Sequence, residues 1–412
     1  MFTCYEYIIW GVVGLLWAVQ IAYLFLLYNP VNREARRRAN LPKVEEPEVT
    51  TPADGQLSMF DTPAVRPLPG ISVIIVACNQ DIQLRENLPA ILEQDYPKFE
   101  VIVVNDNSND ETSDVLQQMQ SRYPHLRTTF TPETTRRISH RKLALTLGIK
   151  GARYEWLAFA DIDSRPVSNQ WLRSMTAHLV AADDRLISDV DTVFGYTGLE
   201  KSKGLSAALR RFDVMLTGMR LLGLGIRHKA HMALGSNLIY RRSIFFDNKG
   251  YSAHLDLERG EDDIFVNENI LPTHICAEVS PESIIRSTET TRHHWQSEKL
   301  GRIATRRHLH GFMPFILSAD TVTRALYVLL TSAAIVVAIL MKWWITLGII
   351  VFLWALRYAA QWFIFTRASR HLGENNYGPA MPLLDICQPA WELALRARYL
   401  LSSKRAYHRK QI

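Results

Sequence analysis

The longest uninterrupted apolar run near the start of the chain extends from Tyr7 to Tyr28. Its length matches the roughly 20 residues that a helix needs to cross a bilayer. Aromatic side chains lie near both of its ends, as membrane interfaces favour. Glu6 precedes the run and a cluster of arginines follows it. Positive charge collects on the cytoplasmic side, whereas a cleaved signal peptide has its positive charges first. We therefore interpret 1–30 as a transmembrane anchor with a cytoplasmic C-terminal end.

Two further apolar runs, Ala325–Met341 and Trp343–Phe365, lie near the other end of the chain. They predict a transmembrane helical hairpin over 322–368. Arg357 and Gln361 interrupt the second run, and two interpretations remain open for them. Either they reach toward an interface from a spanning helix, or the helix lies partly in the interface.

Two segments outside these runs lack the pattern of a packed domain. Residues 41–69 are rich in Pro, Glu and Thr and have little apolar periodicity, so we predict a cytoplasmic linker over 31–69. Residues 383–401 are amphipathic, with Trp391 among them. They predict a helix on the membrane surface, within a cytoplasmic tail at 369–412.

Between the membrane segments, buried-strand patterns alternate with helical patterns. Strands are predicted over 71–79, over 99–105 and from 156, and helices over 84–94, 110–123 and 140–152. This alternation is typical of βαβ units and a parallel sheet. We therefore expect an α/β domain over 70–315, with ligands bound beyond the carboxyl ends of its strands.

The strand pattern from Trp156 ends on two carboxylates one residue apart, Asp161 and Asp163. Residues i and i+2 of a strand share a face, so both should point the same way and repel each other unless a cation lies between them. Such oxygen ligands suit Mg²⁺ or Mn²⁺, which take further oxygens from substrate phosphates. A lone Asp-x-Asp is more often a turn at the end of a strand. Here Asn79 and Asp106 also follow strand patterns, and polar strand ends at one edge favour a metal–diphosphate site.

Two charged segments further along have both ordinary and functional interpretations. Gly260–Asn267 places three carboxylates at the start of a predicted helix, where the helix dipole alone favours acidic residues. Arg286–His310 is rich in Arg and His. It could be a solvated helix face or a clamp on a polyanionic ligand.

Composition narrows the function classes. The 412 residues are 48% hydrophobic, which is enough for a large core in addition to membrane segments. The net charge of +6 comes without a basic run interleaved with aromatics, so no nucleic-acid partner is expected. The same balance suits an anionic membrane surface. The four cysteines are scattered and form no CxxC pair, which predicts neither disulfides nor a zinc site.

In their joint order these segments resemble the membrane-associated family 2 glycosyltransferases of the GT-A fold. The resemblance covers about residues 71–310. Ile74–Asn79 is similar to the opening strand, and Asp95–Ser108 is similar to the second strand with its acidic end. The pair at 161 and 163 is similar to the family's Asp-x-Asp, and Gly260–Asp262 to its Glu-Asp pair. The implied fold is an α/β nucleotide-sugar-binding domain with transmembrane helices on both sides.

The resemblance also implies roles for individual residues. The nucleotide sugar would be bound by Ala77, Asn79, Asp106, Lys142, Asp161 and Arg307. The sugar and acceptor pocket would include Gly235, Ser236 and Asn237. A divalent metal, Mg²⁺ or Mn²⁺, would be held by Asp163 with Asp161. Asp262 would be the general base, and Glu261 would position the acceptor or Asp262.

Some positions depart from the family pattern. Cys78, Asn105 and Asn107 replace the usual Tyr, Asp and Gly near the base. The later Gln-x-x-Arg-Trp motif is reduced to Ala304–His308, which retains Arg307 but lacks both Gln and Trp. This weakens the case for a processive synthase.

The resemblance thus implies an inverting glycosyltransferase that moves a sugar from a nucleotide-diphosphate sugar, with a UDP-sugar expected first, to a lipid-linked or polysaccharide acceptor. The expected location is a bacterial inner membrane, with the catalytic domain cytoplasmic. Two alternatives stay open. One is a catalytically inactive membrane scaffold of the same fold. The other is a nucleotidyltransferase, although 78–81 lack its Gly-rich phosphate loop. A transporter is disfavoured, since about three spans are too few for a substrate path.

Overall fold

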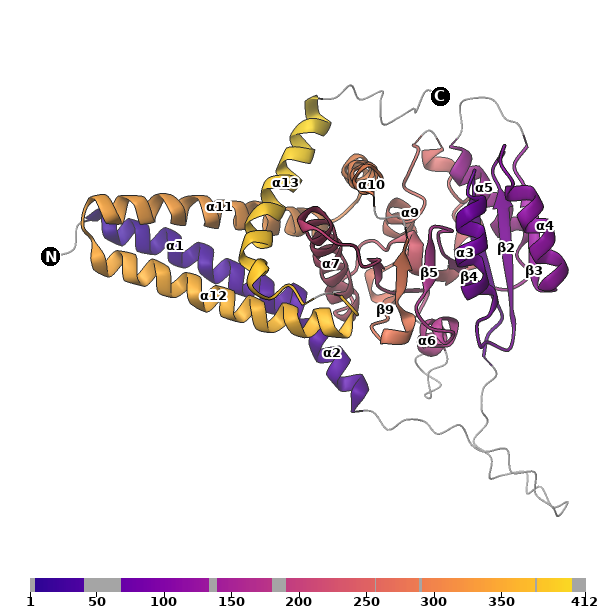
Figure 1. The fold of residues 1–412 in the computed structure, drawn as a ribbon, viewed down its shortest axis with the longest axis horizontal. Helices are drawn as coiled ribbons and strands as arrows, with labels where there is room; N and C mark the ends of the chain where they lie inside the picture. The colour runs from indigo at the N-terminus through magenta and orange to yellow at the C-terminus, as the bar shows by residue number, and fades with distance from the viewer. Residues whose placement is uncertain are drawn as a thin grey trace, which may run out of the picture.

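The computed structural model describes residues 4–40, 68–132, 139–179, 190–255, 257–288, 291–374 and 376–401. A bundle of long apolar helices lies beside an α/β domain (Figure 1). The predicted linker at 41–67 falls outside the described residues. At its start, however, the chain is still helical up to Ala39, so the first part of the segment assigned to the linker is a continuation of the membrane helix.

The α/β domain is built on a seven-stranded sheet of order β3-β2-β1-β4-β8-β6-β9. Its strands are β1 (Ile71–Ala77), β2 (Phe99–Asn105), β3 (Leu126–Phe130), β4 (Trp156–Phe159), β6 (Thr192–Phe194), β8 (Leu238–Arg241) and β9 (Ile275–Ala277). The strands β1 to β4 are parallel, and β8 is antiparallel to both of its neighbours. This confirms the predicted α/β class with a mainly parallel sheet.

Helices cover both faces of the parallel half, which explains why its strands read as continuous apolar runs. Ile71, Val73 and Ile75 share one core with α3 and α4, whereas Ile74 faces a second core with α5 and α7. The flanking helices are α3 (Asp81–Leu92), α4 (Thr112–Arg122), α5 (His140–Gly151), α6 (Trp171–Thr176) and α7 (Leu205–Ile226). The carboxyl ends of β1, β2 and β4 lie at one edge of the sheet, as predicted.

A second, three-stranded sheet and three helices complete the domain. The sheet has the order β5-β10-β7, and its strands are β5 (Ser164–Pro166), β7 (Thr197–Leu199) and β10 (Ile285–Ser287). The helices are α8 (Arg242–Asp247), α9 (Asp263–Asn269) and α10 (Arg292–Thr305). Because β5 begins directly after the turn that follows β4, the second sheet extends the carboxyl edge of the first.

Within the described residues, three helical segments are long and apolar enough to cross a membrane, namely Cys4–Ala39, Met313–Leu340 and Trp344–His371. The first is continuous through α1 (Cys4–Tyr23), one π-helical turn (Leu24–Tyr28) and α2 (Asn29–Ala39). The other two are α11 and α12, which form the predicted hairpin. The three helices run side by side (Figure 1).

Two polar residues of α12, Arg357 and Gln361, turn inward within the bundle. Arg357 and Gln361 are buried, and both donate to the carboxylate of Asp385 on α13 (Met381–Leu401) at 2.8 Å. The amphipathic pattern of the tail therefore reflects packing of α13 against α7, α10 and α11. A buried carboxylate with paired cations explains how charges are tolerated in this bundle.

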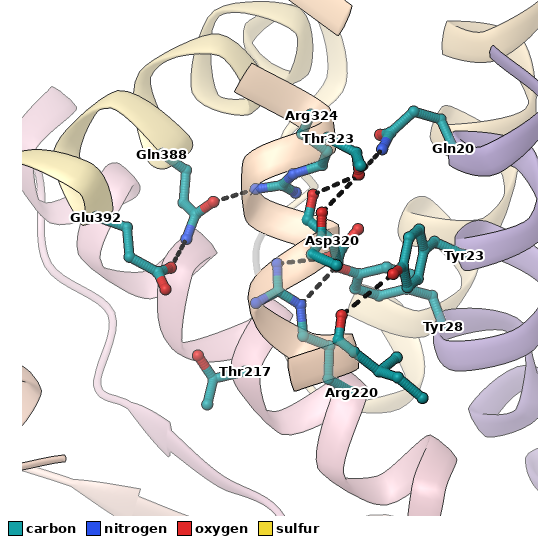
Figure 2. Close-up of polar contacts among 12 residues, drawn as sticks. Gln20, Tyr23, Tyr28, Thr217, Arg220, Asp320, Thr323, Arg324, Gln388 and Glu392 are labelled. Atoms are coloured by element: carbon teal, nitrogen blue, oxygen red, sulfur yellow. Dashed lines mark hydrogen bonds and ion pairs between the residues drawn. The ribbon is translucent and has the colours of Figure 1, made fainter. Parts of the chain in front are cut away.

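The bundle and the α/β domain are joined by a buried polar cluster, which Figure 2 shows. The Asp320 carboxylate on α11 accepts from the Tyr28 hydroxyl at 2.7 Å and lies 2.7 Å from the Arg220 guanidinium of α7. Arg220 also donates to the Tyr28 hydroxyl at 2.7 Å. All three residues are almost completely buried. The cluster thus ties α7 to both the N-terminal helix and α11.

We expect Asp385→Asn to lower the free energy of unfolding by about 3–5 kcal/mol, because the buried Arg357 loses its counter-charge. Denaturant unfolding of the detergent-solubilised protein measures this loss. Asp114→Asn, on the exposed face of α4, is the matched control and should change stability little. Equal effects of the two substitutions would contradict the role given to Asp385.

Candidate active site

A cavity of about 270 Å³ opens at the carboxyl edge of the sheet. Its wall is formed by the turn after β4, the segment before β8, the start of α9, and faces of α7 and α10. Six of the residues predicted from sequence line it: Asp161, Asp163, Gly235, Ser236, Glu261 and Asp262. The structure therefore brings together side chains that are about 100 residues apart in the sequence.

Asp161 and Asp163 do not lie on a strand, which corrects the expectation from the sequence. The strand β4 ends at Phe159, and both carboxylates lie in the turn that leads into β5. The backbone N–H and the hydroxyl of Ser164 donate to the Asp161 carbonyl, at 3.1 and 2.8 Å. The backbone at Asp161–Asp163 is thus the polar turn at a strand end that the sequence analysis gave as the ordinary interpretation. The carboxylates of this turn nevertheless line the cavity.

Neighbouring elements hold this turn in place through its backbone. The Asn87 amide of α3 donates to the Ile162 carbonyl at 2.9 Å. Thr288 donates to the Asp163 carbonyl through its N–H at 2.7 Å and through its hydroxyl at 2.8 Å. These bonds to backbone carbonyls fix the position of the turn.

Arg141, which no sequence motif singles out, connects two of the predicted site residues. Its guanidinium donates to Asp161 at 2.5 Å and to Glu261 at 2.6 Å. Lys142, the predicted residue, is fully buried, and its ammonium donates to the carbonyls of His254 and Arg259 at 2.5 and 2.9 Å. Adjacent residues of a helix face different directions, so the first turn of α5 sends Arg141 to the cavity and Lys142 into the protein. The one feature of the sequence that points to Arg141 is that it is basic and directly precedes Lys142.

Asp262 caps the N-terminus of α9. Its carboxylate accepts from the N–H of Asp263 and from the N–H of Gly235, both at 2.7 Å. Burial, and then the nearby carboxylates of Asp263 and Glu261, raise the pKa of Asp262 to about 7. Asp262 therefore has the role at a helix N-terminus that the helix dipole favours for acidic residues. Its raised pKa also suits proton transfer near neutral pH.

Two glycines allow this arrangement. A Cβ at Gly235 would lie 3.1 Å from the Cβ of Asp262, so a larger residue would push the carboxylate from its place. Gly260 has φ of +106°, a conformation that side chains strongly disfavour, and it turns the chain just before Glu261.

Three of the residues predicted to bind the nucleotide sugar, Ala77, Asn79 and Asp106, lie at strand ends but are not among those lining the cavity. Ala77 is the buried last residue of β1. Asn79, with φ of 53°, accepts a hydrogen bond from the Asn109 N–H at 2.8 Å. Asp106 accepts from the Thr131 hydroxyl at 2.6 Å. Their neighbours Val76 and Gln80 do line the cavity.

Two other predicted residues lie away from it. Asn237 is fully buried, accepts from the Trp171 indole at 3.0 Å and donates to the Tyr196 and Ser283 carbonyls. Arg307 is exposed on the short helical turn after α10. The basic residues of the Arg286–His310 segment that line the cavity come from α10 itself: His294, Lys299 and Arg302. The Arg286–His310 segment was recognised as a possible clamp, but its helical register was needed to select these three.

The residues present suit a divalent cation that shares its ligands with a substrate. The Asp163 carboxylate lies 3.6 Å from Nε2 of His294, and the Asp161 carboxylate is two residues away in the same turn. Within the described part of the chain, no group of three or more His, Cys, Asp or Glu side chains forms a closed metal site. Mg²⁺ and Mn²⁺ are commonly held by one or two carboxylates, with waters and phosphate oxygens completing the shell.

Comparison with known proteins finds a family match over part of the chain. Residues 72–247 match the family model described as glycosyl transferase family 2. The chain is similar to the probable glycosyltransferase YdaM of Bacillus subtilis, at 26% identity over 37% of this chain and 33% of the relative. It is also similar to the glycosyltransferase AglE of Haloferax volcanii, at 29% identity over 46% and 58% of the two chains. The chain thus spans between a third and three-fifths of the length of these relatives.

Among solved structures, the chain is similar to the mannosyltransferase PcManGT from Pyrobaculum calidifontis in complex with GDP-Man and Mn²⁺. The TM-score is 0.48 at 20% identity, covering 94% of this chain and 99% of that one. A second similar structure is S. aureus TarS 1-349 in complex with UDP-GlcNAc. Its TM-score is 0.41 at 15% identity, over 80% and 91% of the two chains.

The raised pKa of Asp262 predicts how stability depends on pH. In the unfolded chain this carboxyl ionises near 3.8, but in the folded protein it ionises near 7, so ionisation between these values destabilises the fold. Asp262→Asn removes this effect. Measured without metal, the stability of the variant relative to wild type should rise by on the order of 2 kcal/mol between pH 5 and pH 8. A pH-independent difference in unfolding free energy would contradict the assignment.

Proposed function

Starting from the glycosyl transferase family 2 domain that this chain carries at residues 72–247, we propose that the protein is an inverting glycosyltransferase. It would move a sugar from a nucleotide-diphosphate sugar, with a UDP-sugar expected first, to a lipid-linked or polysaccharide acceptor. The observation that carries the proposal is one cavity lined by the Asp161–Asp163 turn and by Asp262, whose pKa is raised to about 7.

Departure of the nucleoside diphosphate creates negative charge at the turn after β4. A divalent metal held by Asp163 and Asp161 would stabilise that charge when bound. The guanidinium groups of Arg141 and Arg302 and the ammonium of Lys299 line the same cavity and would add to the stabilisation. Arg141 also contacts Asp161 directly and so keeps this carboxylate in place.

Asp262 would act as the general base. With a pKa of about 7, a large fraction of the carboxylate is ionised at neutral pH and can accept the proton of an acceptor hydroxyl. The oxygen of that hydroxyl would attack the anomeric carbon opposite the departing diphosphate, which inverts the anomeric centre. Glu261 would act through Arg141, to which it is hydrogen-bonded, and thereby orient the groups around Asp161.

The membrane location follows from the helices. Three segments are long and apolar enough to cross a bilayer, and basic residues follow the first at Arg36, Arg37 and Arg38. By the positive-inside rule the α/β domain would be cytoplasmic, and the family resemblance favours a bacterial inner membrane. A donor made in the cytoplasm would then reach the cavity directly. The inactive scaffold is the remaining alternative, and it predicts no donor binding.

Donor binding should require the metal carboxylate. We expect a matching nucleotide sugar among the UDP-, GDP- and dTDP-sugars to raise the unfolding temperature of wild type only with Mn²⁺ or Mg²⁺. Asp163→Asn should abolish the rise, whereas Asp114→Asn should retain it. Thermal shift on detergent-purified protein measures both. Absence of any shift across the screen, in a folded wild type, would favour the scaffold.

Transfer should depend on Asp262 and on pH. For wild type, kcat/KM should fall as the pH drops below about 7, because protonated Asp262 cannot accept the acceptor proton. Asp262→Asn should lower kcat by about 10²–10⁴-fold with donor binding retained. Steady-state kinetics from pH 5.5 to 8.5 test both statements. Normal turnover by Asp262→Asn would exclude it as the base.

A further inference from the structure

A second cavity, of about 130 Å³, lies between α7, α10, α13 and the start of α11. The mechanism above assigns no ligand to it, although Lys299 and Arg302 line both cavities. It shares part of its wall with the first cavity, through Thr217, Leu221, Asp263, Trp295, Lys299 and Arg302. Since Asp263 directly follows Asp262, a ligand in the second cavity lies next to the proposed base.

Cationic side chains outnumber acidic ones in this second cavity. The cations that line it are Arg220, Lys299, Arg302, Arg306 and Arg396, and the acids are Asp213, Asp263 and Glu392. Three cations have a carboxylate partner, namely Arg220 with Asp320, Lys299 with Asp213, and Arg396 with Glu392. Arg302 and Arg306 have no carboxylate within 4 Å among the described residues. Arg302 still interacts electrostatically with Asp263 and is assigned above to the leaving diphosphate, so the positive charge left for a second ligand is that of Arg306.

Two side chains of the second cavity, Arg306 and His231, have no carboxylate partner among the described residues. Arg306 donates to the Pro314 carbonyl, and burial, together with the nearby Arg396 and Arg220, lowers its pKa. His231 is only 6% exposed and lines the cavity, and its Nδ1 has no hydrogen-bond partner in the described part of the protein. A buried polar atom without a partner is costly, and an anion beside the charge of Arg306 would supply a hydrogen bond to Nδ1 of His231 when that nitrogen carries the proton.

The remaining wall is apolar and leads toward the membrane helices. Ile303, Leu309, Leu317 and Leu395 line it beside the cations. At the start of α11 the rings of Phe312 and Phe315 are 66% and 64% exposed and lie next to each other. An anionic head in the cavity could therefore continue into a hydrocarbon chain along α11.

We propose that this cavity binds the phosphate or diphosphate head of a lipid-linked sugar, with the lipid chain leaving along α11 and the sugar reaching Asp262. The proposal rests on the proposed glycosyltransferase function, because it names the acceptor class of that reaction. It favours the lipid-linked acceptor over a free polysaccharide.

The test measures lipid binding without donor. Polyprenyl monophosphate is titrated into the full chain in detergent micelles, with polyprenol and inorganic phosphate as comparison ligands, and the unfolding temperature is recorded. We expect polyprenyl monophosphate to bind at least 10-fold more tightly than either comparison ligand. Equal binding of polyprenol would overturn the anion site, and equal binding of inorganic phosphate would overturn the lipid source.

Arg306→Gln should weaken polyprenyl monophosphate binding at least 10-fold, because Arg306 lines this cavity and not the first one. Arg398→Gln, on the exposed side of α13, is the matched control and should bind as wild type does. If Arg306→Gln unfolds at a lower temperature without ligand, Arg306→Lys retains the charge and should restore most of the affinity. Wild-type affinity in Arg306→Gln would overturn the proposal.

Donor binding separates this proposal from the proposed function. Arg306→Gln should still show the metal-dependent shift with the nucleotide sugar. Lipid-phosphate binding by a wild type that binds no donor would overturn the transferase and leave the lipid site. If the wild type binds a donor but does not bind polyprenyl monophosphate, the lipid site is overturned and the transferase proposal stands.

Discussion

The charge pair between Arg220 and Asp320, completed by the Tyr28 hydroxyl, determines how the α/β domain sits on the membrane helices. A buried guanidinium and a buried carboxylate must meet, because removing one partner leaves an uncompensated charge that costs about 3–5 kcal/mol. Figure 2 shows the cluster where three parts of the chain converge, from residues 28, 220 and 320. It gives α7 one defined position relative to α11.

The position of α7 in turn shapes both cavities. One side of the helix belongs to the main core, through Phe212, Leu216 and Met219. Another side contributes Thr217 and Leu221 to the wall that the two cavities share. Hydrogen bonds of Gln388 position α13 in a similar way. Gln388 accepts from Arg324 of α11 and donates to Glu392, also on α13, at 2.9 Å (Figure 2). The membrane helices therefore help to form the sites as well as anchoring the protein.

Much of the fold was predictable because its signals are local. The strand over 99–105 has the predicted bounds, and the predicted helices are present to within a few residues, since apolar periodicity reports burial directly. The carboxylates at 161, 163, 261 and 262 were also predictable as a set from the order of the motifs. Their shared cavity agrees with that set. Lys142 and Asn237 were different, because each is polar and yet buried in backbone contacts that no sequence motif announces.

By itself the sequence determined the membrane segments, the mainly parallel sheet and the edge at which polar strand ends collect, because each depends on periodicity or on residue order. Only the tertiary structure decided which side of a helix faces the cavity. It selected Arg141 over Lys142, and Arg302 over Arg307, since a shift of one or a few positions rotates a side chain to another face. It also decided that Asp385 neutralises Arg357, because a pairing between residues on separate helices depends on how those helices pack, and no local pattern encodes that.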